Sequence, residues 1–139
     1  MRVLLDANII ISGLRFGGAP RFILEAIDND VCRGFTSATA IAETEEVLIL
    51  KFRVFPSEWI VISEALRNAL VVIPTPVVPE VPELRDKRDL HILAPAELCA
   101  ADYIVSGDKD LLALGWYKSI PIIRANDFVS AFGVTIDRS

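Results

Sequence analysis

Two aspartates follow short apolar runs in the same way, and they are the first candidates for chemistry in this sequence. Asp6 comes directly after residues 3–5, and Asp108 comes three positions after residues 103–105. The composition of both runs favours β-strands. In open α/β sheets, ligands bind outside the carboxyl ends of the strands. Two strands that end in acid therefore predict a divalent cation at that edge of a sheet.

Two further acids lie on the apolar faces of predicted helices. At about 100° per residue, Glu43 falls inside the apolar arc of a helix predicted over 38–51, whereas the next two glutamates fall outside it. Asp89 lies at the centre of an apolar stripe on a helix predicted over 89–100. A carboxylate that faces the core is costly unless it is paired or bound to a metal. The alternative for Asp89 is a helix N-cap, a position that aspartate prefers.

Four acids that converge on one site suit a hard cation better than a cluster of salt bridges. Mg²⁺ and Mn²⁺ prefer oxygen ligands, and Mg²⁺ usually keeps several waters. Such an ion can stabilise the attacking and leaving oxygens of a phosphodiester displacement. The only histidine, His91, is expected to face solvent rather than to bind the metal. The predicted metal ligands, which are also the predicted catalytic residues, are Asp6, Glu43, Asp89 and Asp108.

Short strands alternate with helices along the chain. Strands are predicted at about 3–6, 31–36, 70–73, 103–105 and 120–123, and helices at about 8–14, 20–28, 38–51, 56–69 and 89–100, after 110, and from 125 or 126 to 132. This alternation indicates a parallel sheet with helices on both faces. We therefore predict an α/β fold, a three-layer α/β/α sandwich with a central, mostly parallel sheet of about five strands.

The 139 residues suit a single domain covering 1–139. No apolar stretch approaches the roughly 18 residues of a membrane-spanning helix. Asp6 interrupts the first apolar run too early for a signal peptide, so we expect a cytoplasmic protein without a membrane partner. Cys32 and Cys99 are far apart in the chain, which favours buried thiols over a disulfide or a zinc site.

The net charge of −5 argues against broad electrostatic binding to nucleic acid. A nuclease remains compatible with it, because acids that surround a metal count as negative only until the cation binds. The basic residues closest in sequence to the acidic motifs are Arg15, Lys87, Arg88 and Lys109. These four residues, together with Arg21, Lys51 and Arg53, are the candidates for contacting RNA; the alternative is an ordinary surface of mixed charge.

Four segments together resemble the PIN domain family. They are Leu-Leu-Asp6-Ala-Asn8-Ile-Ile-Ile-Ser-Gly, the stretch from Ser37 through Glu43 to Val-Leu48, Asp-Lys-Arg-Asp89-Leu-His-Ile-Leu, and Ala-Asp-Tyr-Ile-Val-Ser-Gly-Asp108-Lys-Asp-Leu-Leu. The resemblance runs from residue 1 to about 129 and is greatest to bacterial and archaeal proteins described as toxin components of toxin–antitoxin pairs. It implies a doubly wound sheet and a metal-dependent endoribonuclease that hydrolyses RNA phosphodiester bonds.

The resemblance also assigns roles to individual residues. The family's acidic residues map onto Asp6, Glu43, Asp89 and Asp108, and the positions that support the site map onto Asn8, Ser106 and Asp110. Two positions depart from the family pattern. Ser106 stands where threonine is usual, which keeps the hydroxyl group. Pro95 stands inside the predicted helix of Asp89, where an interior proline costs roughly 3 kcal/mol, so that helix is expected to kink or to begin later.

The partners implied by the resemblance are an RNA substrate and a small antitoxin protein. Trp59, Ile60, Val61 and Ile62 are consecutive apolar residues on one predicted helix, so they cannot all face one core. The exposed part predicts a protein interface. We expect a homodimer, with an antitoxin segment that covers part of the helical surface or reaches the metal site with a basic side chain.

Two other functions are compatible with these motifs. The first is a phosphotransfer or dehalogenase-like enzyme that uses Asp6 as a nucleophile, although Asn8 stands where such sites typically have a second acid. The second is a PIN-fold interaction or regulatory protein that is catalytically weak or inactive. Metal-dependent RNA cleavage that is abolished by Asp6→Asn separates the nuclease from both.

Overall fold

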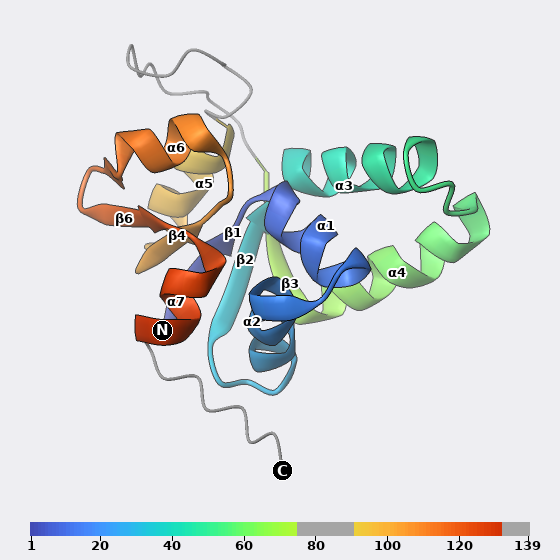
Figure 1. Cartoon of the computed structure of the whole chain (residues 1–139), viewed down its shortest axis with the longest axis horizontal. Helices are drawn as coiled ribbons and strands as arrows, with labels where there is room; N and C mark the ends of the chain where they lie inside the picture. Colours follow the sequence, from blue (N-terminus) through green and yellow to red (C-terminus); the bar gives the residue numbers. More distant parts are fainter. Residues whose placement is uncertain (75–90, 132–139) are drawn as a thin grey trace.

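Six strands form one sheet at the centre of the structure, a computed structural model that describes residues 1–74 and 91–131 (Figure 1). The strand order is β3-β2-β1-β4-β6-β5. The β5–β6 pair is antiparallel, and the other neighbours pair in parallel. The strands are β1 (Arg2–Leu5), β2 (Arg33–Ser37), β3 (Leu70–Ile73), β4 (Tyr103–Val105), β5 (Trp116–Tyr117) and β6 (Ile120–Ile123).

Helices cover both faces of this sheet, which confirms the predicted three-layer fold. They are α1 (Ala7–Arg15), α2 (Gly18–Asp28), α3 (Ala38–Leu50), α4 (Pro56–Ala69), α5 (Leu93–Leu98), α6 (Lys109–Leu114) and α7 (Ala125–Ala131). Successive side chains of a strand point to opposite faces. Val3 and Leu5 accordingly pack with α1, α2, α4 and α7, whereas Leu4 packs with α5 and α6.

The strand order reverses between β1 and β4. The chain proceeds from β1 outward to β2 and β3, and then returns to add β4 on the other side of β1. Leu5 is paired with Val105, and the backbone N–H of Asp6 donates to Val105 O at 3.1 Å. The carboxyl ends of β1 and β4 are therefore adjacent. Such a reversal is where α/β sheets bind ligands.

The sixth strand is an addition to the predicted sheet of about five. β5 contains only Trp116 and Tyr117, directly after Gly115 at φ 75°. Glycine adopts this left-handed conformation without steric cost, and the chain turns there to pair β5 with β6. A two-residue strand carries no alternation that a sequence pattern could reveal. The other predicted strands are present, with β2 beginning two residues later than expected.

α5 begins later than predicted, and Pro95 explains the difference. The helix starts at Leu93, so Pro95 lies in its first turn. The first N–H groups of a helix have no partner within the helix, and proline costs little there. Asp89, Lys87 and Arg88 lie outside the described residues, as does the predicted end of the last helix at 132.

Both cysteines are buried free thiols, as predicted, and burial raises their pKa. Within residues 1–74 and 91–131, no helix is long and apolar enough to cross a membrane.

Candidate functional site

Asp6 is a buried carboxylate at the reversal point of the sheet, with 7 % of its surface exposed. Its Oδ1 accepts a hydrogen bond from the backbone N–H of Ala7 at 2.8 Å, as the cap of α1. Its Oδ2 accepts from Ser106 Oγ at 2.7 Å and from Asn8 Nδ2 at 3.2 Å. In the described part of the chain no lysine or arginine forms an ion pair with it.

Burial dominates the electrostatics of Asp6 and raises its pKa. The hydrogen bonds from Ser106 and Ala7 oppose this effect, and the negative charge of Glu43 adds to it. Donors that bind the ionised form favour it, whereas desolvation disfavours it. The hydrogen bonds therefore hold Asp6 in place and favour its ionised form, but they offset the desolvation of that form only in part.

Asn8 and Ser106 connect the end of β1 to the loop after β4. The side chain of Asn8 accepts from the backbone N–H of Gly107 at 2.9 Å while its amide donates to Asp6. Ser106 is fully buried; its hydroxyl donates to Asp6 and accepts from the N–H of Asp108 at 3.0 Å. The structure thus brings these predicted supporting residues together. Ser106, which stands where the family usually has threonine, thus uses its hydroxyl group to bind Asp6.

Asp108 lies beside this network as the N-cap of α6. Its Oδ1 accepts from the backbone N–H of Asp110 at 2.9 Å and of Leu111 at 3.1 Å. The side chain is half-buried, and Asp110 is half-buried in the first helical turn. One oxygen of Asp108 is therefore fixed by the helix terminus.

His91 is buried and contacts Glu43, so its predicted position in solvent is wrong. It is 8 % exposed, and its Nε2 lies 3.0 Å from Glu43 Oε1. Its Nδ1 lies 3.3 Å from Ser37 Oγ, which already accepts from the N–H of Ala40 at 2.9 Å. A carboxylate can only accept, so the contact with Glu43 favours a proton on Nε2, and a neutral ring then accepts the Ser37 hydroxyl at Nδ1. The prediction failed because His91 precedes α5, where helical periodicity does not apply.

Glu43 lies at the edge of the buried face of α3 rather than within it. The buried residues of this helix are Ala40, Ile41, Thr44 and Leu48. Leu50, an apolar residue at the end of the same helix, is 73 % exposed, so the apolar residues of this helix do not all face the core. The side chain of Glu43 is 39 % exposed. It is nevertheless close enough to Asp6 for its charge to raise the pKa of that carboxyl.

The chemistry of the site fits a hard cation, although its ligand set is incomplete within the described residues. Among these residues, no group of three His, Cys, Asp or Glu side chains is arranged to hold a metal ion. Asp6, Glu43 and Asp108 belong to three segments that meet around the carboxyl end of β1, and Asp89 lies outside the description. Mg²⁺ usually keeps several waters and binds directly to one or two carboxylates. The oxygen donors and the buried Asp6 suit such an ion.

A hollow of about 390 Å³ opens beside the Asp6 network. We call it the Arg124 pocket; its lining residues are Asn8, Ile9, Ser12, Pro20, Ser106, Gly107, Arg124, Ala125 and Asn126. Arg124 was not among the predicted candidates for contacting RNA, yet it follows β6 directly, as Asp6 follows β1. Its position after a strand was the signal available in the sequence. Of the predicted basic residues, Arg15 instead lies over the ring of Phe52.

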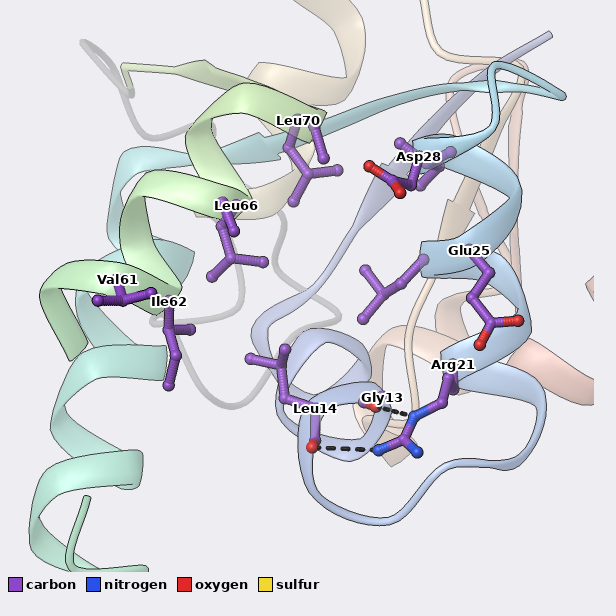
Figure 2. Close-up of a pocket in the computed structure, with 13 residues that line it drawn as sticks. Gly13, Leu14, Arg21, Glu25, Asp28, Val61, Ile62, Leu66 and Leu70 are labelled. Atoms are coloured by element: carbon purple, nitrogen blue, oxygen red, sulfur yellow. Dashed lines mark hydrogen bonds between the residues drawn. The ribbon is translucent and has the colours of Figure 1, made fainter. Parts of the chain in front are cut away.

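A second hollow, of about 500 Å³, lies between α1, α2 and α4 (Figure 2). Figure 2 shows Val61, Ile62 and Leu66 on α4 across from Arg21, Glu25 and Asp28 on α2. The Arg21 guanidinium donates to the carbonyls of Gly13 and Leu14, at 2.9 and 3.3 Å. We call this the α2–α4 groove.

The apolar run on α4 is divided between core and surface, as predicted. Trp59 is 7 % exposed, whereas Ile60 is 65 % and Val61 68 % exposed.

Comparison with known proteins agrees with the observed fold. Residues 2–110 match the family model described as PIN domain. PAE2754 from Pyrobaculum aerophilum has a similar structure, with a TM-score of 0.61 and 19 % identity over 96 % of this chain and 90 % of that one. FitAcB from Neisseria gonorrhoeae gives a TM-score of 0.58 and 16 % identity over 88 % of this chain and 97 % of that one. At these identities the likeness shows the fold alone. No curated protein matches the sequence.

Proposed function

We propose that this chain, which belongs to the PIN domain family, is a metal-dependent endoribonuclease and the toxin component of a toxin–antitoxin pair. PIN domains are generally nucleases, which supports a hydrolase at the level of the family. The observation that carries the proposal is Asp6, a buried carboxylate with a raised pKa at the reversal point of the sheet. A structural salt bridge does not explain it, because no lysine or arginine pairs with it within the described residues.

In this proposal Asp6, Glu43, Asp89 and Asp108 hold Mg²⁺ or Mn²⁺. When bound, the cation supplies charge stabilisation to the attacking and leaving oxygens of the RNA phosphodiester. The protein's own contribution is to fix the positions of the carboxylates. Ser106 and Asn8 fix the Asp6 carboxylate, and the α6 terminus fixes one oxygen of Asp108. Supporting hydrogen bonds of this kind keep ligands in a productive geometry.

Two contacts favour a second candidate, a PIN-fold interaction protein with little or no activity. Glu43 has a partner in His91, and Asp108 caps a helix. Both acids therefore have structural roles that need no metal. Asp6 is the residue that distinguishes the candidates, because the interaction protein gains nothing from its cost of burial.

Cleavage of a mixed single-stranded RNA with and without Mg²⁺ or Mn²⁺ tests the proposal. Wild-type protein should cleave only with metal, and Asp6→Asn should abolish cleavage. Asp28→Asn on the surface of α2 is a control that should leave the rate unchanged. Cleavage that survives Asp6→Asn would contradict the proposed site. A folded wild-type protein that cleaves no RNA with either metal would support the interaction protein.

We also propose a cytoplasmic protein that forms a homodimer and binds an antitoxin. The exposed Ile60 and Val61 and the adjoining α2–α4 groove supply apolar surface for these contacts. Light scattering before and after Ile60→Ser with Val61→Ser measures the dimer, and co-purification with the product of the neighbouring gene measures the antitoxin. A monomer that ignores that product, and that cells tolerate at high expression, would refute the toxin role and leave the nuclease intact.

A further inference from the structure

The Arg124 pocket shares two walls with the network around Asp6. Asn8 and Ser106 line the pocket, and the same two side chains donate hydrogen bonds to the Asp6 carboxylate. Gly107, another lining residue, donates its N–H to Asn8. Whatever occupies the pocket therefore lies directly beside the carboxylate site.

Among the described residues, Arg124 is the one lysine or arginine that lines this pocket, and its side chain is exposed. Within residues 1–74 and 91–131 its guanidinium makes no ion pair or ring contact. Other arginines are engaged. Arg2 donates to Cys99 O and Arg21 to Gly13 O, both as part of the fold. A guanidinium without such a task, at the rim of an acidic site, remains available to an anion.

The lining of the pocket is mixed in a way that suits a nucleotide. Ile9, Pro20 and Ala125 supply apolar surface, and Ser12 and Asn126 supply polar side chains on the same hollow. A volume of about 390 Å³ lies within the usual range for small-ligand pockets, roughly 300–1,000 Å³. It can admit one unstacked base with its sugar, whereas a base inside a duplex cannot enter a pocket of this kind.

We propose that the Arg124 pocket binds one nucleotide of single-stranded RNA next to the scissile phosphate, with the Arg124 guanidinium on the phosphate of that nucleotide. The subsite rests on the proposed nuclease function and names its substrate more closely. Arginine suits this task because its planar donors match phosphate oxygens in pairs. The chain carries a net charge of −5 and clusters acids at this edge, so RNA needs a local cation to approach.

Binding of a fluorescent single-stranded pentanucleotide, measured by anisotropy in the Asp6→Asn background to prevent turnover, tests the subsite. Arg124→Gln should weaken binding about tenfold, as expected for one charge-assisted contact. It should also reduce the slope of log affinity against log salt by about 0.7, the value for one phosphate of a single strand. Arg124→Lys should keep most of the slope and lose part of the affinity. In the active protein Arg124→Gln should raise KM with little change in kcat.

Arg67→Gln is the matched control, because Arg67 is exposed on α4 and does not line the pocket. It should leave both affinity and slope unchanged. Equal losses from the two glutamine variants would reduce the effect to net charge and overturn the subsite. So would unchanged binding in Arg124→Gln, or an equal dependence on Arg124 for a duplex of the same sequence.

The subsite and the nuclease fail separately. Metal-dependent cleavage lost in Asp6→Asn but indifferent to Arg124→Gln in KM and binding would refute the subsite and leave the nuclease standing. RNA binding that depends on Arg124, without cleavage by the wild type, would refute the nuclease and leave the binding site for RNA standing. Melting curves of each variant confirm that the fold is intact.

Discussion

Glu43→Gln separates two roles for Glu43 that predict opposite results. The change removes the charge and keeps the shape, and the amide oxygen of glutamine can still accept from His91 Nε2. A hydrogen bond to a charged group contributes about 1.5–3 kcal/mol. The Glu43 side chain is 39 % exposed, so solvent screening reduces the charged part to at most about 1 kcal/mol. Loss of that part is offset by relief of the repulsion that Glu43 exerts on Asp6.

If Glu43 is a metal ligand, the free energy of unfolding should therefore change by less than about 1 kcal/mol, or roughly 2–4 °C in Tm. Cleavage should fall much further. Mutation of a residue that only supports a metal ligand typically reduces metal affinity or activity 10–100-fold. Mutation of a ligand itself should therefore reduce the cleavage rate on the order of 100-fold or more. The assays are urea melts without metal and RNA cleavage across a Mn²⁺ titration. A clearly destabilised protein with normal cleavage would show that Glu43 serves the fold and not the metal.

His91→Leu completes this test as a double-mutant cycle. If His91 acts on cleavage by orienting Glu43, its replacement should reduce the rate in the wild type and have little further effect beside Glu43→Gln. Glu45→Gln and Glu46→Gln, on the same helix, should change neither stability nor cleavage. Equal effects from all three glutamates would refute the argument that the helical face selects Glu43.

Three further predictions concern the buried carboxylate and the packing of the sheet. Burial raises the pKa of Asp6 in the folded protein above its ordinary 3.8. Between the ordinary pKa and the raised pKa, the native state binds more protons than the unfolded chain, so the free energy of unfolding falls as pH rises through that window. Asp6→Asn removes this loss, so its advantage in urea melts should grow as pH rises above about 4 and level off once the pH has passed the raised pKa of Asp6; a difference that stays constant with pH would refute the shift. Millimolar Mg²⁺ or Mn²⁺ should raise the Tm of the wild type by mass action and leave Asp6→Asn unchanged; an unmoved wild-type midpoint would count heavily against the site. Gly34→Ala should cost about 1–3 kcal/mol, because the new Cβ lies 2.6 Å from side-chain atoms of both Ile27 and Leu70, whereas Gly107→Ala, whose nearest contact is 3.5 Å, should cost little.

The fold was predictable because its strands are short apolar runs between helices of clear periodicity. The predicted bounds of β3, β4 and β6 agree with the structure. A parallel strand covered on both faces reads as a continuous apolar run, and residues 103–105 have this form. β5 has no such signal, because its existence depends on the turn at Gly115 and on the neighbouring β6.

The site was predictable where it depends on strand ends and not where it depends on helix starts. Asp6 and Asp108 each follow a strand, and the order of the strands makes those ends adjacent. His91 was misplaced because a helical wheel was extended back to residue 89. Pro95 indicated the later start, because proline is tolerated in the first turn of a helix and a helix that begins at residue 89 would place it in the interior.

The burial of the Asp6 carboxylate lowers the stability of the folded protein. A carboxylate that is 7 % exposed is partly compensated by Ser106, Asn8 and the α1 terminus, and its pKa is raised all the same. Local departures of this kind are expected at functional sites, where the surrounding fold offsets their cost. Asn8 and Ser106 hold this carboxylate from one side and form a wall of the Arg124 pocket on the other. The same two side chains therefore fix the acid that would bind the cation and the distance from it to a nucleotide bound in that pocket.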